Sequence, residues 1–479
     1  MNIRNISKSN LWLWVFTFSI CCILIIPVLI QNGMFMDAVQ YSAVSRNLSE
    51  GHGSFWSLQF DLYNIHDLTS FSEQPPLAFV IQAIFFKILG TSIYTERIYT
   101  FVCLILTIIL INKSWQLISG RENKYHEFGW LPVLLWITIP IVFWSFRNNM
   151  LENTMGVFVL LSGFYIFKGL KGTKIYLSLF IGAIFIFLAT LTKGLPGLFT
   201  ISIPILFSLI YNNIKFLKSV LLSTYLTILI TAFYLILFLI VPESRQFYER
   251  YFVDRTLGRI GTESNNEGPL FIIIALLQQL LFPIAFTTIL ILFSSKTKGG
   301  KRITINKNGI FLMLIGLAGT LPMMLTPVQK QFYLTPALPF FALGFTFFII
   351  PKISLFVDDL FNQKVRRIAL RTVSSILIMT TIILCIINFG SVSRDDLYIA
   401  DAKKIADQVE YGSTIGSTTT VYYNWVMHSY LIRNHSIFLD HKKDHEFYLL
   451  DKRYDSIPNS KYYTTNSDLH FFELMKVTN

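Results

Sequence analysis

Charged residues are scarce in this sequence. Lys, Arg, Asp and Glu make up 14% of its 479 residues, whereas soluble proteins carry about 25%. Apolar residues reach 53%, and the mean hydropathy is +0.54. A chain of this composition has too few charged side chains to cover a water-soluble surface, so we predict an integral membrane protein.

Acidic residues are fewer than basic ones, 28 against 40, which leaves a net charge of +12. A basic excess can indicate nucleic-acid binding. Most of these Lys and Arg residues, however, fall in short gaps between apolar runs, where the positive-inside rule places them. The charge therefore indicates membrane topology, and no nucleic-acid partner is expected.

The sequence also lacks cysteines at metal-ligand spacing and a loop for ATP, and these two absences reduce the classes of function to consider. The four cysteines lie inside apolar runs without metal-ligand spacing, so we expect them to be small core residues. No Gly-rich phosphate-binding loop for ATP is present, which argues against an ATP-driven pump. The cysteines are Cys21, Cys22, Cys103 and Cys385.

Long apolar runs recur along most of the chain. A helix needs about 17 to 25 apolar residues to cross a bilayer. The first run is longer than the roughly 7 to 15 residues of a signal-peptide core, so we expect it to be retained. A shorter run at 76–90 is interpreted as a membrane-edge or re-entrant helix, because a crossing there would reverse every later loop. The eleven predicted spans are 10–30, 97–112, 129–146, 155–170, 174–191, 196–211, 218–241, 269–294, 309–326, 333–350 and 369–389.

The loop charges predict the orientation. One set of alternate gaps is rich in Lys and Arg, and the opposite short gaps hold single cations. We therefore predict a multi-pass protein of the plasma (inner) membrane with a cytoplasmic amino terminus and an extracytoplasmic carboxyl-terminal segment. The basic gaps contain Arg4 and Lys8; Lys113, Arg121 and Lys124; Lys168, Lys171 and Lys174; Lys215 and Lys218; Lys296, Lys298, Lys301, Arg302 and Lys307; and Lys352, Lys364, Arg366, Arg367 and Arg371. The opposite gaps contain Arg147, Lys193 and Lys330.

Two loops and a tail remain outside the predicted spans. The outer loops, 32–96 and 242–268, are long enough to carry function. After residue 394 the composition changes, and strand-like runs at 413–423 and 462–475 flank a helical pattern at 424–433. The predicted fold is an all-α polytopic membrane domain, 1–394, followed by a small extracytoplasmic α/β domain, 395–479.

Two carboxylates stand out on the predicted outer face. Asp37 directly follows the first span in the run MDAVQY, and Glu73 precedes a diproline in the run FSEQPPL. Each also suits an ordinary helix start, because acidic residues and Pro both favour the first turn. Neither run by itself distinguishes a site from a helix terminus.

Isolated cations recur on the same predicted face. Arg147 and Glu152 lie in the run FRNNMLEN between two spans, Lys193 lies in ATLTKGLP, and Lys330 lies near Tyr333 in QKQFYLTP. A solvated turn explains the first run, and interfacial Lys and Tyr residues explain the other two. Their recurrence together with Asp37 and Glu73 instead favours a polar site suited to the phosphate of a lipid carrier.

The order of these motifs resembles the membrane-embedded GT-C glycosyltransferases of the aminoarabinose-transferase and protein O-mannosyltransferase type (glycosyltransferase family 39-like). The resemblance covers 10–350 and rests on an acidic start to the first outer loop, followed by EXPPL, Arg with an acidic residue, LTKGXP and KXXYXXP. It implies a GT-C fold and an enzyme of cell-envelope glycan biosynthesis. Such an enzyme transfers a sugar from a polyprenyl-phosphate donor to a glycan, lipid or protein acceptor at the extracytoplasmic face.

The resemblance also implies roles for residues of the first outer loop. Asp37 matches the acidic residue that acts in catalysis, and Tyr41 matches an aromatic residue of the same motif. Glu73 matches the acidic residue before the diproline. Gln74 stands where the family often has a Lys, so one contact to the donor phosphate differs here.

Three later matches are less regular. Glu152 replaces an Asp used by some relatives, and Ala38 stands where a second acidic residue is common, which weakens a metal assignment. Arg259, in the second long loop, matches a basic residue there. The implied substrate-binding residues are Tyr41, Gln74, Arg147, Lys193, Arg259, Lys330 and Tyr333.

The implied reaction is a direct, inverting displacement. Asp37 accepts the proton of the acceptor hydroxyl, and the cations hold the phosphate that leaves. Glu73 and Glu152 complete the implied catalytic set by orienting cations, binding sugar hydroxyls or sharing a divalent cation. A carboxylate set favours Mg²⁺ or Mn²⁺, with Asp37 and Glu152 as the candidate ligands.

Another class of function stays open. A lipid-linked glycan flippase, a transporter or a polymer ligase could use the same polar groups without this reaction. The charges stand at span ends on one face, whereas ion-coupled carriers place them near the midplane, which argues against a transporter. A purely structural membrane protein would leave the outer charges unexplained.

Overall fold

The computed structural model describes residues 3–62, 70–253, 268, 270–295, 306–326, 328–456, 462–465 and 468–478. Contacts between Cα atoms divide the chain into two compact units. Unit 1 comprises Met1–Pro27, Thr100–Arg147 and Leu151–Ile387, and unit 2 comprises Val28–Tyr99, Asn148–Met150 and Asn388–Asn479. This grouping places the first outer loop with the tail, whereas the domain boundary predicted from the sequence falls between residues 394 and 395.

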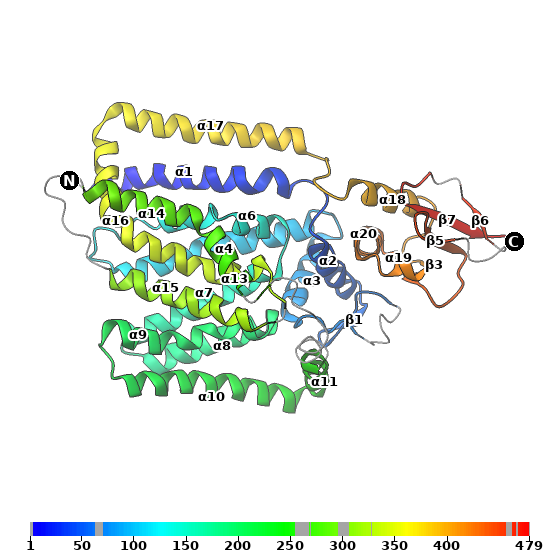
Figure 1. Cartoon of the computed structure of the whole chain (residues 1–479), viewed down its shortest axis with the longest axis horizontal. Helices are drawn as coiled ribbons and strands as arrows, with labels where there is room; N and C mark the ends of the chain where they lie inside the picture. The colour runs from blue at the N-terminus through cyan, green and yellow to red at the C-terminus, as the bar shows by residue number, and fades with distance from the viewer. Residues whose placement is uncertain are drawn as a thin grey trace. The chain divides into compact units, whose positions relative to one another are not determined.

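Unit 1 is built from long apolar helices that run side by side (Figure 1). Helices with most of their residues in unit 1 are α1 (Ile3–Leu29), α4 (Thr95–Ser119), α5 (Trp130–Ile137), α6 (Pro140–Arg147), α7 (Leu151–Lys171), α8 (Ile175–Lys193), α9 (Ile203–Tyr211), α10 (Phe216–Ile240), α11 (Pro242–Arg250), α13 (Phe271–Gln279), α14 (Leu281–Ser295), α15 (Lys307–Thr320), α16 (Leu338–Asn362) and α17 (Lys364–Asn388). Within the described part of this unit, 3₁₀ segments join them at η2 (Leu195–Ser202), η4 (Leu321–Leu325) and η5 (Gln331–Ala337).

The helix lengths confirm a polytopic membrane protein. Among the described residues, eight helices are long and apolar enough to cross a membrane, and two bent helix pairs raise the number to ten. The eleventh predicted span, 196–211, is the shorter apolar stretch Leu195–Tyr211, in which η2 precedes α9. In the pair α5–α6 the axis bends by 78°, because Pro140 at the start of α6 cannot continue the preceding helix.

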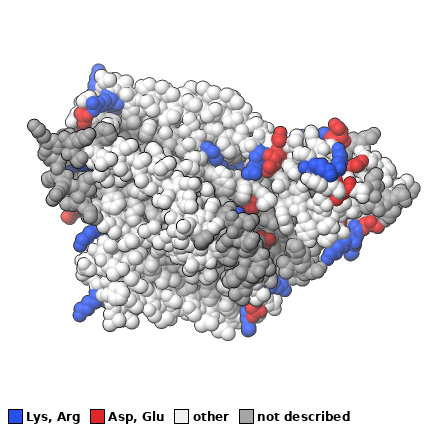
Figure 2. Space-filling view, viewed as in Figure 1, with Lys and Arg blue, Asp and Glu red and all other residues white. Residues whose placement is uncertain are grey.

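The outer surface of unit 1 suits a lipid environment. In α17 only 11% of the most apolar window is buried within the protein, and in α10 the share is 22%. Figure 2 shows that the visible face of these helices is almost free of Lys, Arg, Asp and Glu among the residues drawn as described, and that the charges gather near helix ends. Apolar side chains that point outward along a whole helix are solvated by hydrocarbon rather than by water.

Unit 2 contains a mixed α/β segment, as the composition of the tail predicts. Its five-stranded sheet has the order β4-β3-β5-β7-β6, in which β3 is parallel to β4 and β5, while β7 is antiparallel to β5 and β6. The parallel β3–β4 pair needs a crossover, which α19 and α20 supply. The elements are β3 (Thr414–Ser417), α19 (Thr419–Tyr422), α20 (Trp425–His435), β4 (Phe438–Asp440), β5 (Phe447–Asp451), β6 (Tyr462–Thr464) and β7 (Phe472–Val477), preceded by α18 (Asp396–Ala406).

The first outer loop folds onto this segment. It forms α2 (Met36–Ser49), a hairpin of β1 (Gly53–Ser54) and β2 (Ser57–Leu58), and α3 (Leu77–Leu89), and α2 packs against both α3 and α20. Helix α3 occupies the run predicted to lie at the membrane edge. Its 13 residues are fewer than a crossing needs, and Gly90, with φ of +80°, ends it.

Candidate functional site

A buried ion pair lies where α8 returns to the start of α7 in unit 1. Glu152 is in the first turn of α7, Lys193 is the last residue of α8, and their side chains are 0% and 6% exposed. Each charge complements the dipole of its own helix. Gly194, with φ of +73°, ends α8 directly after the Lys. The runs FRNNMLEN and ATLTKGLP, distant in sequence, therefore meet at this pair.

The third run of unit 1 completes the surroundings of Lys193. Its Nζ lies 5.4 Å from the ring centroid of Phe332 and 5.1 Å from that of Tyr333, both on η5. A cation over two ring faces is stabilised by their quadrupoles. Lys330 directly precedes η5 and is exposed. The predicted residues Glu152, Lys193 and Tyr333 are thus brought together.

Arg147 is placed differently. It ends α6, where its Nε donates to the Leu24 carbonyl of α1 at 2.6 Å and its guanidinium lies 4.9 Å from the Phe143 ring. The side chain is half-buried. Its described contacts tie α6 to α1, which is a structural role within the helical unit.

An apolar cavity of about 300 Å³ begins beside the Lys193 turn. Helices α8, α10 and α11 and segment η2 line it, and both Thr190 and Gly194 contribute to its wall. The Tyr234 hydroxyl donates to Thr190 Oγ1 at 2.8 Å and lies 3.3 Å from the Tyr248 hydroxyl. Burial raises the pKa of Tyr248 well above its ordinary value, so its hydroxyl stays neutral. The cavity can hold a hydrocarbon chain, with hydroxyls and a Lys close to one end.

Helix α2 carries the predicted residues of the first outer loop in unit 2. Asp37 is in its first turn and is partly exposed, and Tyr41, 4% exposed, packs edge-on against Phe79 of α3 with ring centroids 5.7 Å apart. The residue before α2, Phe35, has no polar side chain to cap the helix. Its backbone N–H instead donates to Asn148 Oδ1 at 2.8 Å.

Glu73 and Gln74 occupy the bend before α3, and both are partly exposed. Because α2 packs against α3, the motifs MDAVQY and FSEQPPL belong to neighbouring elements of one unit. Arg259 lies outside the described residues.

Comparison with solved structures identifies the fold of this chain. The chain superposes on ArnT from Cupriavidus metallidurans in the apo state with a TM-score of 0.67, at 10% identity and 97% coverage of both chains. For ArnT bound to undecaprenyl phosphate, the TM-score is 0.65 at 11% identity, with the same coverage. The apo oligosaccharyltransferase from Archaeoglobus fulgidus gives 0.50 at 11% identity, over 89% of this chain and 64% of that one.

This protein has the GT-C fold. The likeness spans nearly the whole chain, so the GT-C fold includes the helical unit and the mixed α/β tail. No protein-family model matches the sequence, and no curated protein matches it. The expected GT-C fold is confirmed by structure rather than by sequence similarity.

The described residues do not assemble a metal-binding set within this GT-C fold. None of their His, Cys, Asp and Glu side chains form a group of three or more that could hold an ion. Glu152, one of the two candidate ligands, is paired with Lys193. Because Glu152 already has a cationic partner, these residues do not fit the predicted Mg²⁺ or Mn²⁺ site.

Several residues of the site escape sequence reasoning. Tyr234 and Tyr248 line the cavity. Tyr234 lies in an ordinary apolar span, so nothing in the sequence singles it out. Tyr248 lies in the loop run FYERYF, where the high content of aromatic residues could have drawn attention to it. Asn148 carries no signal beyond its place in the polar run FRNNMLEN. Its contact to Phe35 joins residues 113 positions apart.

Proposed function

We propose that this protein transfers a sugar from a polyprenyl-phosphate-linked donor to an acceptor at the extracytoplasmic face of the plasma membrane. The observation that carries this proposal is the buried Glu152–Lys193 pair beside an apolar cavity in a GT-C fold. An amphiphilic donor needs both features, a cation for its phosphate and an apolar channel for its chain. The comparison structure of ArnT holds undecaprenyl phosphate.

Donor binding is assigned to unit 1. The isoprene units nearest the phosphate occupy the cavity that is lined by Gly194 and by side chains of α8 and α10. The Lys193 ammonium has more than one N–H donor, so it can contact the donor phosphate while its pair with Glu152 persists. Lys330, Tyr333, Arg147 and Arg259 remain proposed secondary contacts to the donor.

Acceptor activation is assigned to Asp37 of unit 2, whose partly exposed carboxylate can receive a proton. The acceptor oxygen bonds to the anomeric carbon as its proton passes to Asp37. The bond from that carbon to the phosphate oxygen breaks, and polyprenyl phosphate leaves with the electron pair. One displacement at the anomeric carbon inverts its configuration. Tyr41, Glu73 and Gln74 are proposed to bind the sugar.

The energetic contributions differ in kind. General-base catalysis contributes roughly 10²- to 10⁴-fold in rate. A cation that meets the charge on the leaving phosphate contributes electrostatically, and more strongly where water is excluded. Lys193 at 6% exposure meets that condition.

The proposal is tested by incubating the purified protein with a panel of polyprenyl-phosphate sugars and membrane extract, and by measuring released polyprenyl phosphate with mass spectrometry. Wild type should release it, and Asp37→Asn should do so about 10²- to 10⁴-fold more slowly. Asp396→Asn is the matched control, because Asp396 is also a first-turn carboxylate in unit 2.

Each contrary result has a distinct meaning. An acidic first-turn residue favours the helix dipole without taking part in the reaction, so near-normal turnover by Asp37→Asn would reduce Asp37 to a helix-start residue. Movement of the lipid-linked sugar across the bilayer without release of polyprenyl phosphate would favour a flippase or transporter. Joining of intact lipid-linked chains would favour a polymer ligase.

A further inference from the structure

The segment that leads into α2 is held by the tail of the chain. Asn32 donates its backbone N–H to the Ser391 carbonyl at 2.9 Å, and Ser393 donates to the Asn32 carbonyl at 2.9 Å. The two segments form a parallel bridge at Asn32 and Val392. Gly33, with φ of +85°, fits here because a Cβ would collide with the Arg394 carbonyl oxygen. These contacts hold the start of the first outer loop in a defined position beside residues 391–394.

One side chain of α20 forms a hydrogen bond closer to Asp37 along the same segment. The Tyr430 hydroxyl accepts the backbone N–H of Met34 at 3.2 Å and donates to Asp395 Oδ2 at 3.1 Å. Tyr430 is 2% exposed, and burial raises its pKa, so it keeps its proton for Asp395. Met34 is three residues before Asp37, and the intervening Phe35 is held by Asn148.

The other end of α2 meets the same helix. Arg46 donates from Nη1 to the carbonyls of Ile432 at 3.2 Å and Arg433 at 2.5 Å, both in the last turn of α20. The Ile432 carbonyl also accepts the backbone N–H of Ser436 at 3.0 Å. Burial alone would raise the pKa of Glu50, but hydrogen bonds from Tyr411 and Arg46 outweigh it and lower that pKa. Glu50 therefore stays ionised beside Arg46, at 2.9 Å from its Nε.

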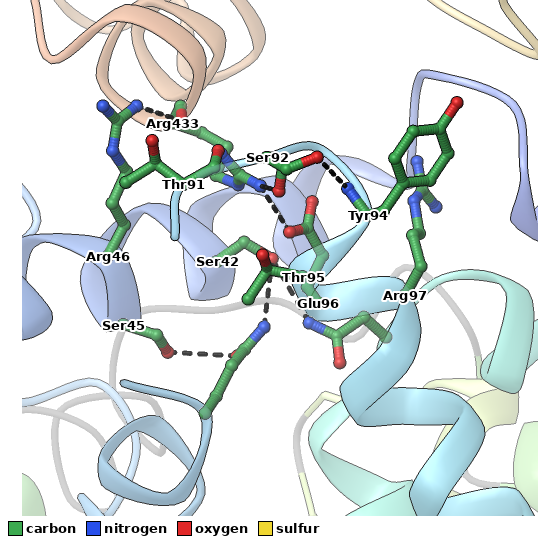
Figure 3. A network of polar contacts seen from close by, with 12 residues as sticks. Ser42, Ser45, Arg46, Thr91, Ser92, Tyr94, Thr95, Glu96, Arg97 and Arg433 are labelled. Carbon is green, nitrogen blue, oxygen red and sulfur yellow. Dashed lines mark hydrogen bonds and ion pairs between the residues drawn. The ribbon is translucent and has the colours of Figure 1, made fainter. Parts of the chain in front are cut away.

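Helix α20 is itself anchored to the turn between α3 and α4. Figure 3 shows Arg433 pointing toward this turn, where it donates to the Thr91 carbonyl at 3.0 Å, to the Ser92 carbonyl at 2.8 Å and to Glu96 at 2.5 Å. The guanidinium is buried, so its removal would leave Glu96 without this countercharge. Within unit 2, helix α20 thus contacts the segment before α2, the carboxyl-terminal end of α2 and the start of α4.

We propose that Tyr430 is a positioning residue that sets the place of Asp37, so that the carboxyl-terminal segment is part of the catalytic scaffold rather than an appendage. The inference rests on the proposed role of Asp37 as general base. A base must lie within hydrogen-bond reach of the proton it accepts, and a displacement of about 1 Å can reduce the rate roughly 10²-fold. Tyr430 acts on Asp37 through the backbone of Met34 and Phe35.

A purely stabilising role for Tyr430 makes a different prediction. A tyrosine that only stabilises the tail lowers the amount of folded protein and leaves turnover per folded molecule unchanged. Tyr462 is a suitable control, because it is buried in the same unit and donates to the His445 carbonyl at 3.0 Å within the tail. Tyr462→Phe removes one tyrosine hydrogen bond without touching α2.

The first test is a double-variant cycle with a polyprenyl-phosphate sugar that wild type cleaves in the release assay. Tyr430→Phe should lower kcat roughly tenfold with the KM for the lipid donor unchanged, whereas Tyr462→Phe should change neither. In the Asp37→Asn background, Tyr430→Phe should cause no further loss. Equal losses in both backgrounds, or full activity of Tyr430→Phe, would overturn the inference while leaving the proposed function intact.

The second test does not depend on catalysis. Amide hydrogen exchange of the peptide covering 33–41 should speed up in Tyr430→Phe and stay at the wild-type rate in Tyr462→Phe, because only the first variant frees the Met34 N–H. Unchanged exchange in Tyr430→Phe would overturn the inference whatever the assay shows. Near-normal turnover by Asp37→Asn would overturn the base assignment, and the positioning role with it.

Discussion

Asp61 and His428 form a buried side-chain pair inside unit 2, with Asp61 Oδ2 lying 2.7 Å from His428 Nε2 and both side chains 0% exposed. The other ring nitrogen, Nδ1, lies 3.0 Å from the Tyr422 carbonyl oxygen. Both ring nitrogens thus face oxygen atoms, which fixes the orientation of the imidazole between the first outer loop and α19. Asp61 belongs to the first outer loop and His428 to α20, so the pair links the same two segments as Tyr430.

We expect this pair to be a major determinant of the stability of unit 2. His428→Gln removes the imidazole that faces the buried Asp61 carboxylate, and a buried polar group left without its partner costs about 1 to 3 kcal/mol. The double variant Asp61→Asn/His428→Gln should recover part of that loss, because no charge then remains buried. Hydrogen exchange of the α20 peptide measures the effect.

The control for this prediction is an exposed pair. Lys404 and Asp468 lie 3.8 Å apart on the surface, and Asp468→Asn should leave exchange almost unchanged because surface pairs contribute little. Equal effects of His428→Gln and Asp468→Asn would contradict a stabilising role for the buried Asp61–His428 contact.

Variants of the Glu152–Lys193 pair should separate the effect of Lys193 on stability from its effect on donor binding. Lys193→Gln leaves Glu152 buried without its cation, so both thermal stability and donor use should fall. Adding Glu152→Gln should restore stability, yet the KM for the lipid donor should stay about 10- to 100-fold raised, because a charge-assisted contact to phosphate is lost. A double variant with wild-type donor KM would show that Lys193 is structural.

Membrane orientation follows from the loop charges and is testable by reporter fusion. A reporter after Asn479 should read extracytoplasmic, and one inserted in the basic gap 296–305 should read cytoplasmic. The two fusions control for one another, since they should report opposite faces. A cytoplasmic reading at Asn479 would mean that the span count is wrong by one, with the run 76–90 as the first candidate for an extra crossing.

The stability of unit 2 should depend on pH through His435. Burial, reinforced by the nearby charge of Arg46, lowers the pKa of His435 from 6.5 to about 4. Arg433 and Lys403 act in the same direction, and Asp407 opposes them. Between those pH values the unfolded chain binds a proton that the folded chain does not, so stability falls as pH drops from about 6.5 to about 4.

The matched variant for this prediction is His435→Gln, which cannot take up the proton. Hydrogen exchange of the tail, measured from pH 7 to pH 4.5 and corrected for the intrinsic rate, should show a smaller loss of protection in the variant than in wild type. Parallel pH profiles of the two proteins would exclude His435 as the responsible group.

Local residue patterns were enough to predict the helices and the membrane setting. Apolar length predicts a span because each residue adds about 1.5 Å of helix and the bilayer core is about 30 Å thick, and ten of the eleven predicted spans correspond to long helices or bent pairs. The motif around Asp37 likewise predicted a carboxylate at a helix start, where α2 now begins at Met36. The run 413–423 is only partly strand, because β3 is four residues long and α19 begins at Thr419.

The amino-acid sequence alone places this chain in a membrane, and it shows which runs are apolar enough to cross and which short runs carry the scarce charges. The pairing of Lys193 with Glu152, of Tyr430 with Met34 and of His428 with Asp61 becomes visible only in the folded chain. Hydropathy and helix-start preferences act within a few residues, whereas these contacts join positions separated by 41 to 396 residues. Their partners are chosen by packing, which no local pattern encodes.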